Sequence, residues 1–169
     1  MFPSAKRVGA IWWTTQEGQT LALKRAEEVA PSFGLEIVRF EVRGAADLAG
    51  AFEAAKRAPV DALLNLASPL TLLKRKVVVR LAEQAGIPML YEQRAFVDDG
   101  GFASFGPDQI ALWKRASAYA AKILDGARPA DLPVELPTRV QLVLNLRAAK
   151  AIGVTIPQSV IERADDVLR

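Results

Sequence analysis

Short apolar segments alternate with amphipathic segments along the first half of the chain, and this alternation restricts the possible folds more than any other feature. Short runs that are apolar throughout, or that alternate apolar with polar residues, predict strands at 8–12, 35–42, 60–67 and 87–91. Helical spacing of apolar residues predicts helices at 16–33, 45–57 and 70–85. Because strands and helices that alternate at this spacing form βαβ units, we expect an α/β fold with a doubly wound parallel sheet.

The first predicted helix carries an apolar stripe that we expect to face the core. This stripe consists of Leu21, Leu23 to Lys24, Ala26 and Val29 to Ala30. Thr14 and Thr15 precede the helix and Glu17 stands in its first turn, a pattern typical of a hydroxyl N-cap followed by an acidic residue. We therefore expect one of the two threonines to cap this helix.

A second distinctive stretch follows the predicted strand 87–91 and a Gly-Gly turn. It contains a short apolar strand at 102–105 and, after a Gly-Pro break, a long helix at 107–125. Pro107 suits the first turn of this helix, where a missing N–H costs nothing. Gly126 suits the position just past the end of the helix, where a left-handed backbone is common.

The helix at 107–125 is apolar around most of its circumference. Its apolar residues form two stripes, Ile110, Trp113, Ala120 and Leu124 on one side and Leu112, Ala116, Tyr119 and Ile123 on the other. A helix of this kind needs burial on more than one side. Residues 126–138 hold three prolines, so we expect them to run extended and to lead into a strand at 140–144.

The composition excludes several classes of function. The chain of 169 residues has no cysteine and no histidine, which removes disulfides, thiolate catalysis, the commonest general base and the commonest transition-metal ligand. Its net charge of +3 is too small to indicate nucleic-acid binding. Hydrophobic residues make up 51% of the chain but are dispersed, so we expect a folded domain with no membrane-inserted segment. We expect no cofactor, no metal and no catalytic site.

Several collinear segments of the chain resemble one protein family. The segment at 100–135 reads GGFASFGPDQIALWKRASAYAAKILDGARPADLPVE, and the chain continues to its end through LPTRVQLVLNLRAAKAIGVTIPQSVIERADDVL. These segments resemble bacterial ABC-uptake substrate-binding proteins whose better known members bind aromatic amino acids. Looser similarity extends back through KRVGAIWWTT, DALLNLASPL and IPMLYEQRAFVDDGG, and so covers nearly the whole chain. The resemblance implies a Rossmann-like lobe of a type I periplasmic binding protein, which captures a small amino-acid-like solute and performs no chemistry.

The chain resembles only the second lobe and the tail of such a protein, because the family folds into two α/β lobes with the ligand between them. The resemblance implies a second-lobe α/β domain at 1–101 and a crossover segment at 102–138 that would pack on a first lobe. A strand and helices at 139–169 would return to the second lobe. An internal start, a deliberate truncation or a split gene would each explain this length.

The start of the chain and its apolar helix bear on location and partners. MFPSAKRVG lacks the apolar stretch of a signal peptide, so we expect this chain as written to stay in the cytoplasm. The full-length parent implied by the resemblance would work in the periplasm beside an ABC permease. Without a first lobe, the helix at 107–125 lacks the surface on which the family packs it. We expect it to bury itself against a second copy, giving a homodimer through residues 102–128.

Candidate ligand-binding residues lie in loops after the predicted strands, because ligands of open α/β sheets bind beyond the carboxyl ends of the strands. After the first strand, Trp13, Thr14 and Gln16 offer an aromatic ring, a hydroxyl and an amide. Ser68 follows the third strand, where the family often has Asp or another polar residue, and its hydroxyl suits a ligand amine or carboxylate. Helix capping is the alternative role for Thr14 and for Ser68, with Pro69 at the first helical position.

The loop after the fourth predicted strand contributes Glu92 and Arg94. A guanidinium can hold a ligand carboxylate through two parallel hydrogen bonds, and Arg94 matches an arginine found in part of the family. Alternatively, Arg94 pairs with Glu92 or Asp98 on the surface. Glu92 replaces a smaller residue of the family, so it either intrudes on the pocket or selects a cationic group.

Other interpretations stay open. A cytosolic α/β sensor or regulatory domain would need a partner domain. A DNA-binding regulator would use residues 147–157, which superficially resemble a helix-turn-helix, but the next predicted helix carries Glu162 and a solvated Asp165-Asp166 pair that phosphate would repel. The Asp98-Asp99 pair before two glycines suggests a cation site, yet a calcium loop needs more oxygens at fixed spacing and a turn explains the pattern better.

Overall fold

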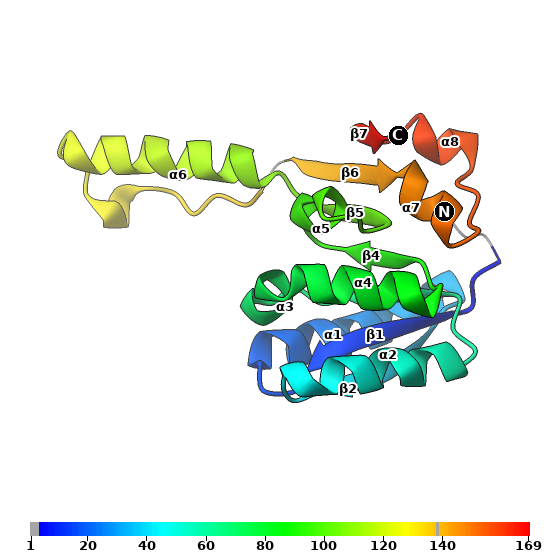
Figure 1. Ribbon diagram of the computed structural model, residues 1–169. Coiled ribbons are helices and arrows are strands. Elements are labelled where there is room, and N and C mark those ends of the chain that lie inside the picture. Colours follow the sequence, from blue (N-terminus) through cyan, green and yellow to red (C-terminus); the bar gives the residue numbers. More distant parts are fainter. Residues whose placement is uncertain (1–3, 138) are drawn as a thin grey trace.

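The computed structural model describes residues 4–137 and 139–169, and its centre is a single seven-stranded sheet (Figure 1). The strands are β1 (Arg7–Trp13), β2 (Glu36–Val42), β3 (Ala62–Asn65), β4 (Met89–Tyr91), β5 (Ala103–Pro107), β6 (Val140–Asn145) and β7 (Asp166–Leu168). Their order across the sheet is β2-β1-β3-β4-β5-β6-β7. All pairs from β2 to β5 are parallel, which confirms the predicted α/β fold with a mainly parallel sheet.

The strand predicted at 140–144 is confirmed as β6, but its direction was not predicted, and β7 was not predicted at all. β6 pairs antiparallel with β5, because the chain leaves the sheet at Pro107 and re-enters at the same edge, where Val140 pairs with Pro107. β7 pairs parallel with β6 at the sheet margin. The prediction of a solvated helix face at Asp165 and Asp166 is therefore wrong: Asp166 begins β7, and a carboxylate oxygen of Asp165 accepts the Leu142 N–H at 2.8 Å.

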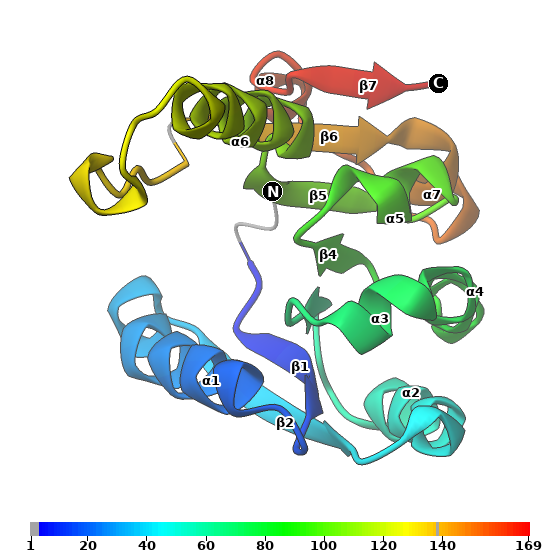
Figure 2. The same cartoon turned by 90° about the vertical axis from the view of Figure 1, so that its left-hand side faces the viewer.

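Helices cover both faces of the sheet. They are α1 (Glu17–Val29), α2 (Leu48–Arg57), α3 (Pro69–Leu73), α4 (Arg75–Ala85), α5 (Arg94–Asp98), α6 (Gln109–Leu124), α7 (Leu146–Ala151) and α8 (Gln158–Ile161). Short 3-10 turns occupy Ala30–Phe33, Ala45–Asp47 and Pro129–Asp131. Figure 2 shows α1 on one face and α2 and α4 on the other, which is the doubly wound arrangement that the sequence predicts.

The apolar stripe predicted for the first helix is only partly buried: Ala30 is buried and Ala26 is half-buried, but other members are not. Leu23 is buried against the sheet, as expected, but Leu21 and Val29 are exposed. The buried face of α1 instead includes Gln19, which stands one helical turn before Leu23. The threonine cap was also wrong: the N-cap position is Gln16, and no side chain there accepts a hydrogen bond from the helix.

The hydrophobic core is divided by the sheet. The main cluster, between the sheet and α2, α4 and α5, contains Ile11, Trp13, Phe40, Val42, Leu48, Phe52, Leu63, Val78, Met89, Tyr91 and Phe96. A second cluster joins β5, β6 and the C-terminal helices through Phe102, Ala103, Leu144, Ala149 and Ile156. Ala10, Leu23 and Leu66 form a smaller group under α1. These clusters give the body its rigidity and hold the strand ends in fixed positions.

Helix α6 leaves the body and forms most of a projecting arm, which we define as residues 108–137 (Figure 1). Its predicted start at Pro107 was wrong by a short distance, because Pro107 ends β5 and Asp108 is the N-cap, accepting the Ala111 N–H at 3.0 Å. Its predicted end is confirmed: Gly126 has a φ of 101°. The N–H groups of Gly126 and Ala127 bond the carbonyls of Ile123 and Lys122, which is a Schellman termination.

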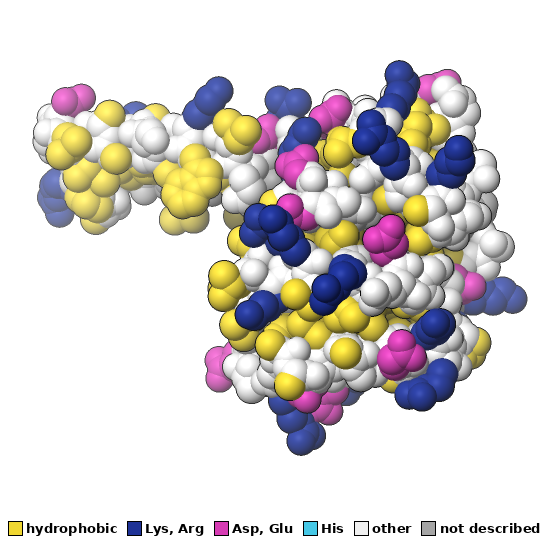
Figure 3. All heavy atoms as spheres, in the orientation of Figure 1, with side chains coloured by type: hydrophobic (Ala, Val, Ile, Leu, Met, Phe, Trp, Pro, Cys, Tyr) yellow, Lys and Arg dark blue, Asp and Glu magenta, His cyan; other side chains and the backbone are white. Residues whose placement is uncertain are grey.

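The arm has few contacts outside itself, and none of the described side chains of α6 is buried. Trp113 is 71% exposed on the helix, and Val134 on the returning segment is 97% exposed. The returning segment is held beside α6 by the Tyr119 hydroxyl, which donates to the Pro133 carbonyl at 2.8 Å, and by an ion pair between Arg115 and Glu135. Figure 3 shows hydrophobic side chains gathered along the arm where it stands clear of the body.

The chain leaves the sheet later than the start of the predicted crossover segment 102–138. Ala103–Pro107 form β5 inside the sheet, and Phe102 lies in the second core cluster, so the chain leaves the body at Asp108. Residues 1–3 of the predicted lobe 1–101 and Thr138, the predicted end of the crossover, lie outside the described residues.

Gly106 is the tightest backbone position at this exit point. A Cβ at Gly106 would overlap the backbone carbonyl oxygen of Glu92 in the neighbouring loop. We expect Gly106→Ala to lower the free energy of unfolding by about 1–3 kcal/mol, because backbone atoms must move to admit the methyl group. Urea unfolding followed by circular dichroism measures the change.

Gly50→Ala is the matched control. Gly50 lies in α2 with nothing within 4 Å of the added carbon, so we expect this variant to gain up to about 1 kcal/mol. Equal unfolding midpoints for the two variants would contradict the assignment of Gly106 as a close backbone contact.

Candidate functional site

β1, β3, β4 and β5 are parallel, so their carboxyl ends lie at the same end of the sheet. We call this end, where these strands terminate, the carboxyl edge. The chain moves from β1 outward to β2 and then back to β3 on the other side of β1, so the strand order reverses between β1 and β3. Ligands of open α/β sheets bind at such a reversal, beyond the strand ends. The arm projects from this same edge, at the end of β5 (Figure 1).

The loops after β1 and β3 are tied together by one buried amide. The Gln19 side chain is 1% exposed. Its Oε1 accepts the Trp13 N–H at 2.6 Å, and its Nε2 donates to the Leu66 carbonyl at 2.8 Å. Sequence reasoning missed Gln19, because a polar residue among apolar helix positions carries no signal of its burial. This clamp fixes the two loops on either side of the strand-order reversal.

Among the predicted residues of the first loop, Trp13 is placed differently from Thr14 and Gln16. Trp13 is the last residue of β1, is 1% exposed and belongs to the main core cluster, because alternate residues of a strand face opposite sides of the sheet. Its indole N–H has no acceptor among the described residues. Thr14 and Gln16 are half-buried at the carboxyl edge, where a ligand role stays a prediction.

Ser68 has the capping role that was its alternative interpretation. Its hydroxyl accepts the Thr71 N–H at 3.0 Å, and Pro69 takes the first position of α3. Thr71 is fully buried, and its hydroxyl donates to the Ser68 carbonyl at 3.0 Å. Ser68 thus caps α3, and a contact between Ser68 and a ligand stays a prediction.

Glu92 lies beside the same loop, half-buried, and joins it through Asn65. The Asn65 Nδ2 donates to Glu92 Oε2 at 2.7 Å. Burial raises the pKa of the Glu92 carboxyl above its ordinary value, and the Asn65 hydrogen bond offsets only part of that rise. Asn65 was not among the predicted site residues, although an asparagine that closes an apolar strand is a usable signal for the end of that strand.

Arg94 is engaged in ion pairs on the surface. Its guanidinium contacts Asp98 at 3.2 Å and Asp166 of β7 at 2.7 Å. The Asp98 pair was an expected alternative, whereas the Asp166 pair depends on the unpredicted β7. Arg94 also lines an open hollow of ≈ 510 Å³ at the base of the arm, together with Leu72, Asp108, Ile110, Trp113 and Gln141.

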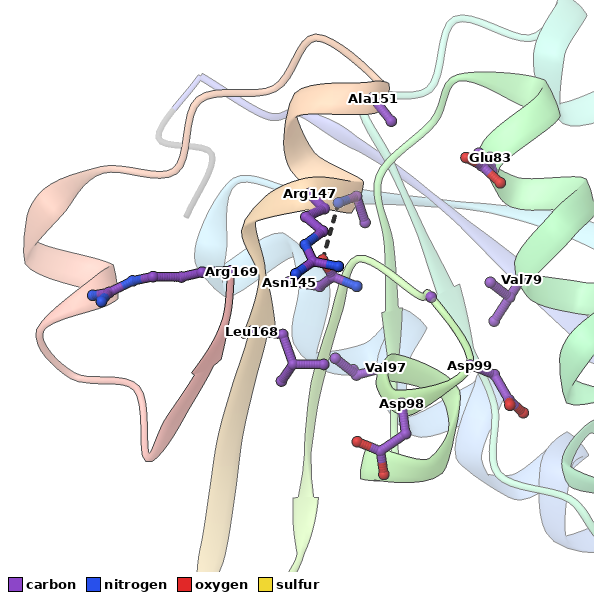
Figure 4. Close-up of a pocket in the computed structure, with 12 residues that line it drawn as sticks. Val79, Glu83, Val97, Asp98, Asp99, Asn145, Arg147, Ala151, Leu168 and Arg169 are labelled. Atoms are coloured by element: carbon purple, nitrogen blue, oxygen red, sulfur yellow. Dashed lines mark hydrogen bonds between the residues drawn. The ribbon is translucent and has the colours of Figure 1, made fainter.

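Another open hollow, of ≈ 520 Å³, lies at the other end of the strands, near the amino end of β5 (Figure 4). We call this end the opposite edge. Asn145 lies there beside the start of β5, and its Oδ1 accepts the Ala148 N–H at 3.0 Å. Asp99, at its margin, pairs with Arg75 of α4 at 2.6 Å. This hollow lies away from the strand-order reversal, so the carboxyl edge is the stronger candidate site.

The structure also bears on metals and membranes. Within residues 4–137 and 139–169, no group of three or more acidic side chains is placed to hold a metal ion. None of the helices in the described part of the chain is long and apolar enough to cross a bilayer.

An open parallel sheet whose order reverses between two polar, tethered loops is typical of a small-molecule-binding α/β protein. The chain belongs to the family of ABC transporter substrate-binding proteins, since residues 1–168 match the model of that family. The family is a non-enzymatic class of binding proteins that normally acts outside the cell or in the periplasm. This membership confirms the resemblance that the sequence suggested.

Known relatives are similar over half of their own length. A tyrosine-binding protein of Clostridioides difficile is 22% identical over 89% of this chain and 43% of that protein. A conserved domain protein from Vibrio cholerae has a TM-score of 0.88 and 25% identity, over 98% of this chain and 55% of its own. An ABC domain from Streptococcus pneumonia, solved with L-Trp, has a TM-score of 0.87 and 26% identity, over 98% and 56%. The chain thus spans about half the length of the relatives it matches.

The raised pKa of Glu92 predicts a pH dependence of stability. The folded state binds the Glu92 proton more tightly than the unfolded state, so this group makes stability fall as pH rises above its ordinary pKa of 4.5. We expect Glu92→Gln, which has no charge to bury, to be stabilised relative to the parent chain at pH 7 more than at pH 4. Urea unfolding across this pH range measures the difference between the two chains.

Glu83→Gln serves as the control, because Glu83 is exposed on α4 and should shift the curve little. If the stability difference between the parent and Glu92→Gln is the same at both pH values, burial of the Glu92 charge is not what determines it.

Proposed function

We propose that this chain is one lobe of the solute-binding component of an ABC-type uptake system and that its carboxyl edge forms one wall of the solute site. The observation that carries the proposal is the position of the strand-order reversal, where the loops after β1 and β3 are clamped by Gln19. The solute class is amino-acid-like. The tyrosine-binding relative and the L-Trp complex support this class.

The other wall is the first lobe of the binding protein, which faces the carboxyl edge. The arm supports this arrangement, because it extends past that edge and carries exposed apolar side chains that need a covering surface. In this proposal the second lobe consists of residues 1–101 and 139–169 together with β5, which lies in the same sheet. The remaining residues between 102 and 138, mainly the arm, are the crossover that packs on the first lobe.

The proposed mechanism is closure of two lobes around a solute. Solute that binds the closed form more tightly than the open form shifts the population toward closure. The closed form would then deliver the solute to an ABC permease on the outer side of the membrane. In this proposal the 169 residues supply one wall, so by themselves they bury less of a solute than a complete pocket does and bind it weakly.

An NMR titration of the ¹⁵N-labelled chain with L-Trp and L-Tyr tests the site. We expect dissociation constants on the order of 1 mM, equivalent to about −4 kcal/mol, because only part of the solute is buried. The amide shifts should concentrate at 14–16, 65–68 and 92–94. The built-in control is the hollow at the opposite edge, where residues 145–148 should not shift.

Shifts confined to the opposite edge would contradict this site. Micromolar or tighter binding measured by calorimetry would contradict the incomplete pocket, because a single wall does not bury enough of a solute for such affinity.

We further propose that the arm of the isolated chain pairs with a second copy, giving the homodimer through residues 102–128. The exposed apolar side chains of the arm are Ile110, Trp113, Ile123, Leu124, Val134 and Leu136. The body offers exposed Leu70 and Leu73 on α3, at the carboxyl edge. Two arms exchanged about a two-fold axis would place each arm beside the α3 of its partner.

Light scattering at micromolar concentration tests the dimer. We expect twice the 18.3 kDa mass for the parent chain and a shift to monomer for Trp113→Glu, because a buried carboxylate opposes the interface. Phe33→Glu is the matched control: Phe33 is as exposed as Trp113 but lies outside the arm, and it should leave the mass unchanged. A monomeric parent chain would overturn the dimer.

A further inference from the structure

Four polar side chains gather at the carboxyl edge between β3 and β4. Asn65 ends β3, Ser68 and Thr71 belong to the start of α3, and Glu92 follows β4. Besides the bonds described above, Asn65 Nδ2 lies 3.4 Å from the Thr71 hydroxyl, and the Ser68 and Thr71 hydroxyls lie 3.3 Å apart. Three of these side chains are more than nine-tenths buried, and only Glu92 is partly exposed.

This cluster has more acceptors than donors. The Asn65 amide nitrogen donates to Glu92 and to Thr71, and the Thr71 hydroxyl donates to the Ser68 carbonyl. Asn65 Oδ1 and Glu92 Oε1 are buried and have no donor among the described residues. Buried acceptors without donors are rare and costly in folded proteins, so each calls for an explanation.

The charge of Glu92 is also uncompensated. The ion pairs among the described residues do not include Glu92, and the nearby Arg94 is engaged by Asp98 and Asp166. The Glu92 carboxylate therefore faces the carboxyl edge with an unused oxygen and no counter-ion.

We propose that Glu92 and Asn65 form a subsite that selects solutes carrying an ammonium group. The inference rests on the proposed function, since it concerns the same edge of the sheet. An ammonium brings three N–H donors and a positive charge, which supply what the two oxygens and the carboxylate lack. Glu92 is the only member of the cluster that is not fully buried and it is hydrogen-bonded to Asn65, so an ammonium from solution would meet the Glu92 carboxylate first.

The burial that raises the pKa of Glu92 agrees with this subsite. A desolvated carboxylate takes up a proton more readily, because the proton neutralises its charge. The ammonium group of a solute would compensate the same negative charge. The subsite also discriminates, because a solute with a carboxylate but no amine would place like charges together.

The test compares two indole probes by NMR on the full chain at pH 7.5. Tryptamine carries the amine without a carboxylate, and indole-3-propionate carries the carboxylate without an amine. We expect tryptamine to bind at least 10-fold more tightly and to shift the side-chain amide signals of Asn65, because a charge-assisted hydrogen bond replaces like-charge repulsion. Glu92→Gln should reduce the preference to less than 3-fold, while the control Glu83→Gln should retain it.

The outcomes separate the subsite from the proposed function. If indole-3-propionate shifts residues of the carboxyl edge as strongly as tryptamine does, and Glu92→Gln changes neither, the edge binds solutes but the ammonium subsite is wrong. If neither probe, nor L-Trp, shifts any residue of this edge, both inferences are overturned.

Discussion

Asp108 holds the junction on which the arrangement of this molecule depends. Its carboxylate caps α6 through the Ala111 N–H and accepts the Gln141 side chain of β6 at 3.0 Å. Its backbone N–H bonds the Arg139 carbonyl, so the outgoing and returning chains are joined where they leave the sheet. Because of this junction, thirty residues can leave the body as an arm and return without disturbing the β5–β6 pairing. The arm is consequently directed past the carboxyl edge rather than folded back on the sheet.

Buried polar groups organise the carboxyl edge itself. Gln19 ties the loops after β1 and β3, and Asn65 ties the loop after β3 to Glu92 after β4. Buried hydrogen bonds of this kind fix loop positions because breaking them leaves unpaired groups inside the protein. The edge is therefore preformed, and among the described residues of this edge Glu92 combines partial exposure with an unused acceptor. A preformed wall suits the proposed mechanism, in which closure of two lobes completes the site.

Sequence patterns predicted the parallel strands and most helices, but they failed where tertiary contacts decide the outcome. Leu21 and Val29 were expected inside and are exposed, because the sheet contacts the face of α1 that contains Gln19 and Leu23. One helix was expected at 70–85, yet the chain forms α3 and α4 with Lys74 between them, outside both helices. The positions of Ser68, Glu92 and Arg94 just beyond the strand ends followed from the strand order, although Arg94 begins α5 and is not in a loop. The capping contact of Ser68 with Thr71 is local and was expected as an alternative, but the contacts of Glu92 with Asn65 and of Arg94 with Asp166 form only through the fold.

The sequence by itself determined the α/β class, the apolar character of α6 and the family to which the chain belongs, and it led to the edge at which we propose that a solute binds. These properties follow from local periodicity and from turn residues such as Gly126, whose left-handed backbone is required at its position. Only the tertiary structure decided that β6 runs antiparallel, that Trp13 belongs to the core, and that Glu92 is half-buried without an ion-pair partner among the described residues. Those outcomes depend on which distant residues share the space around each side chain, and no local pattern in the chain carries that information.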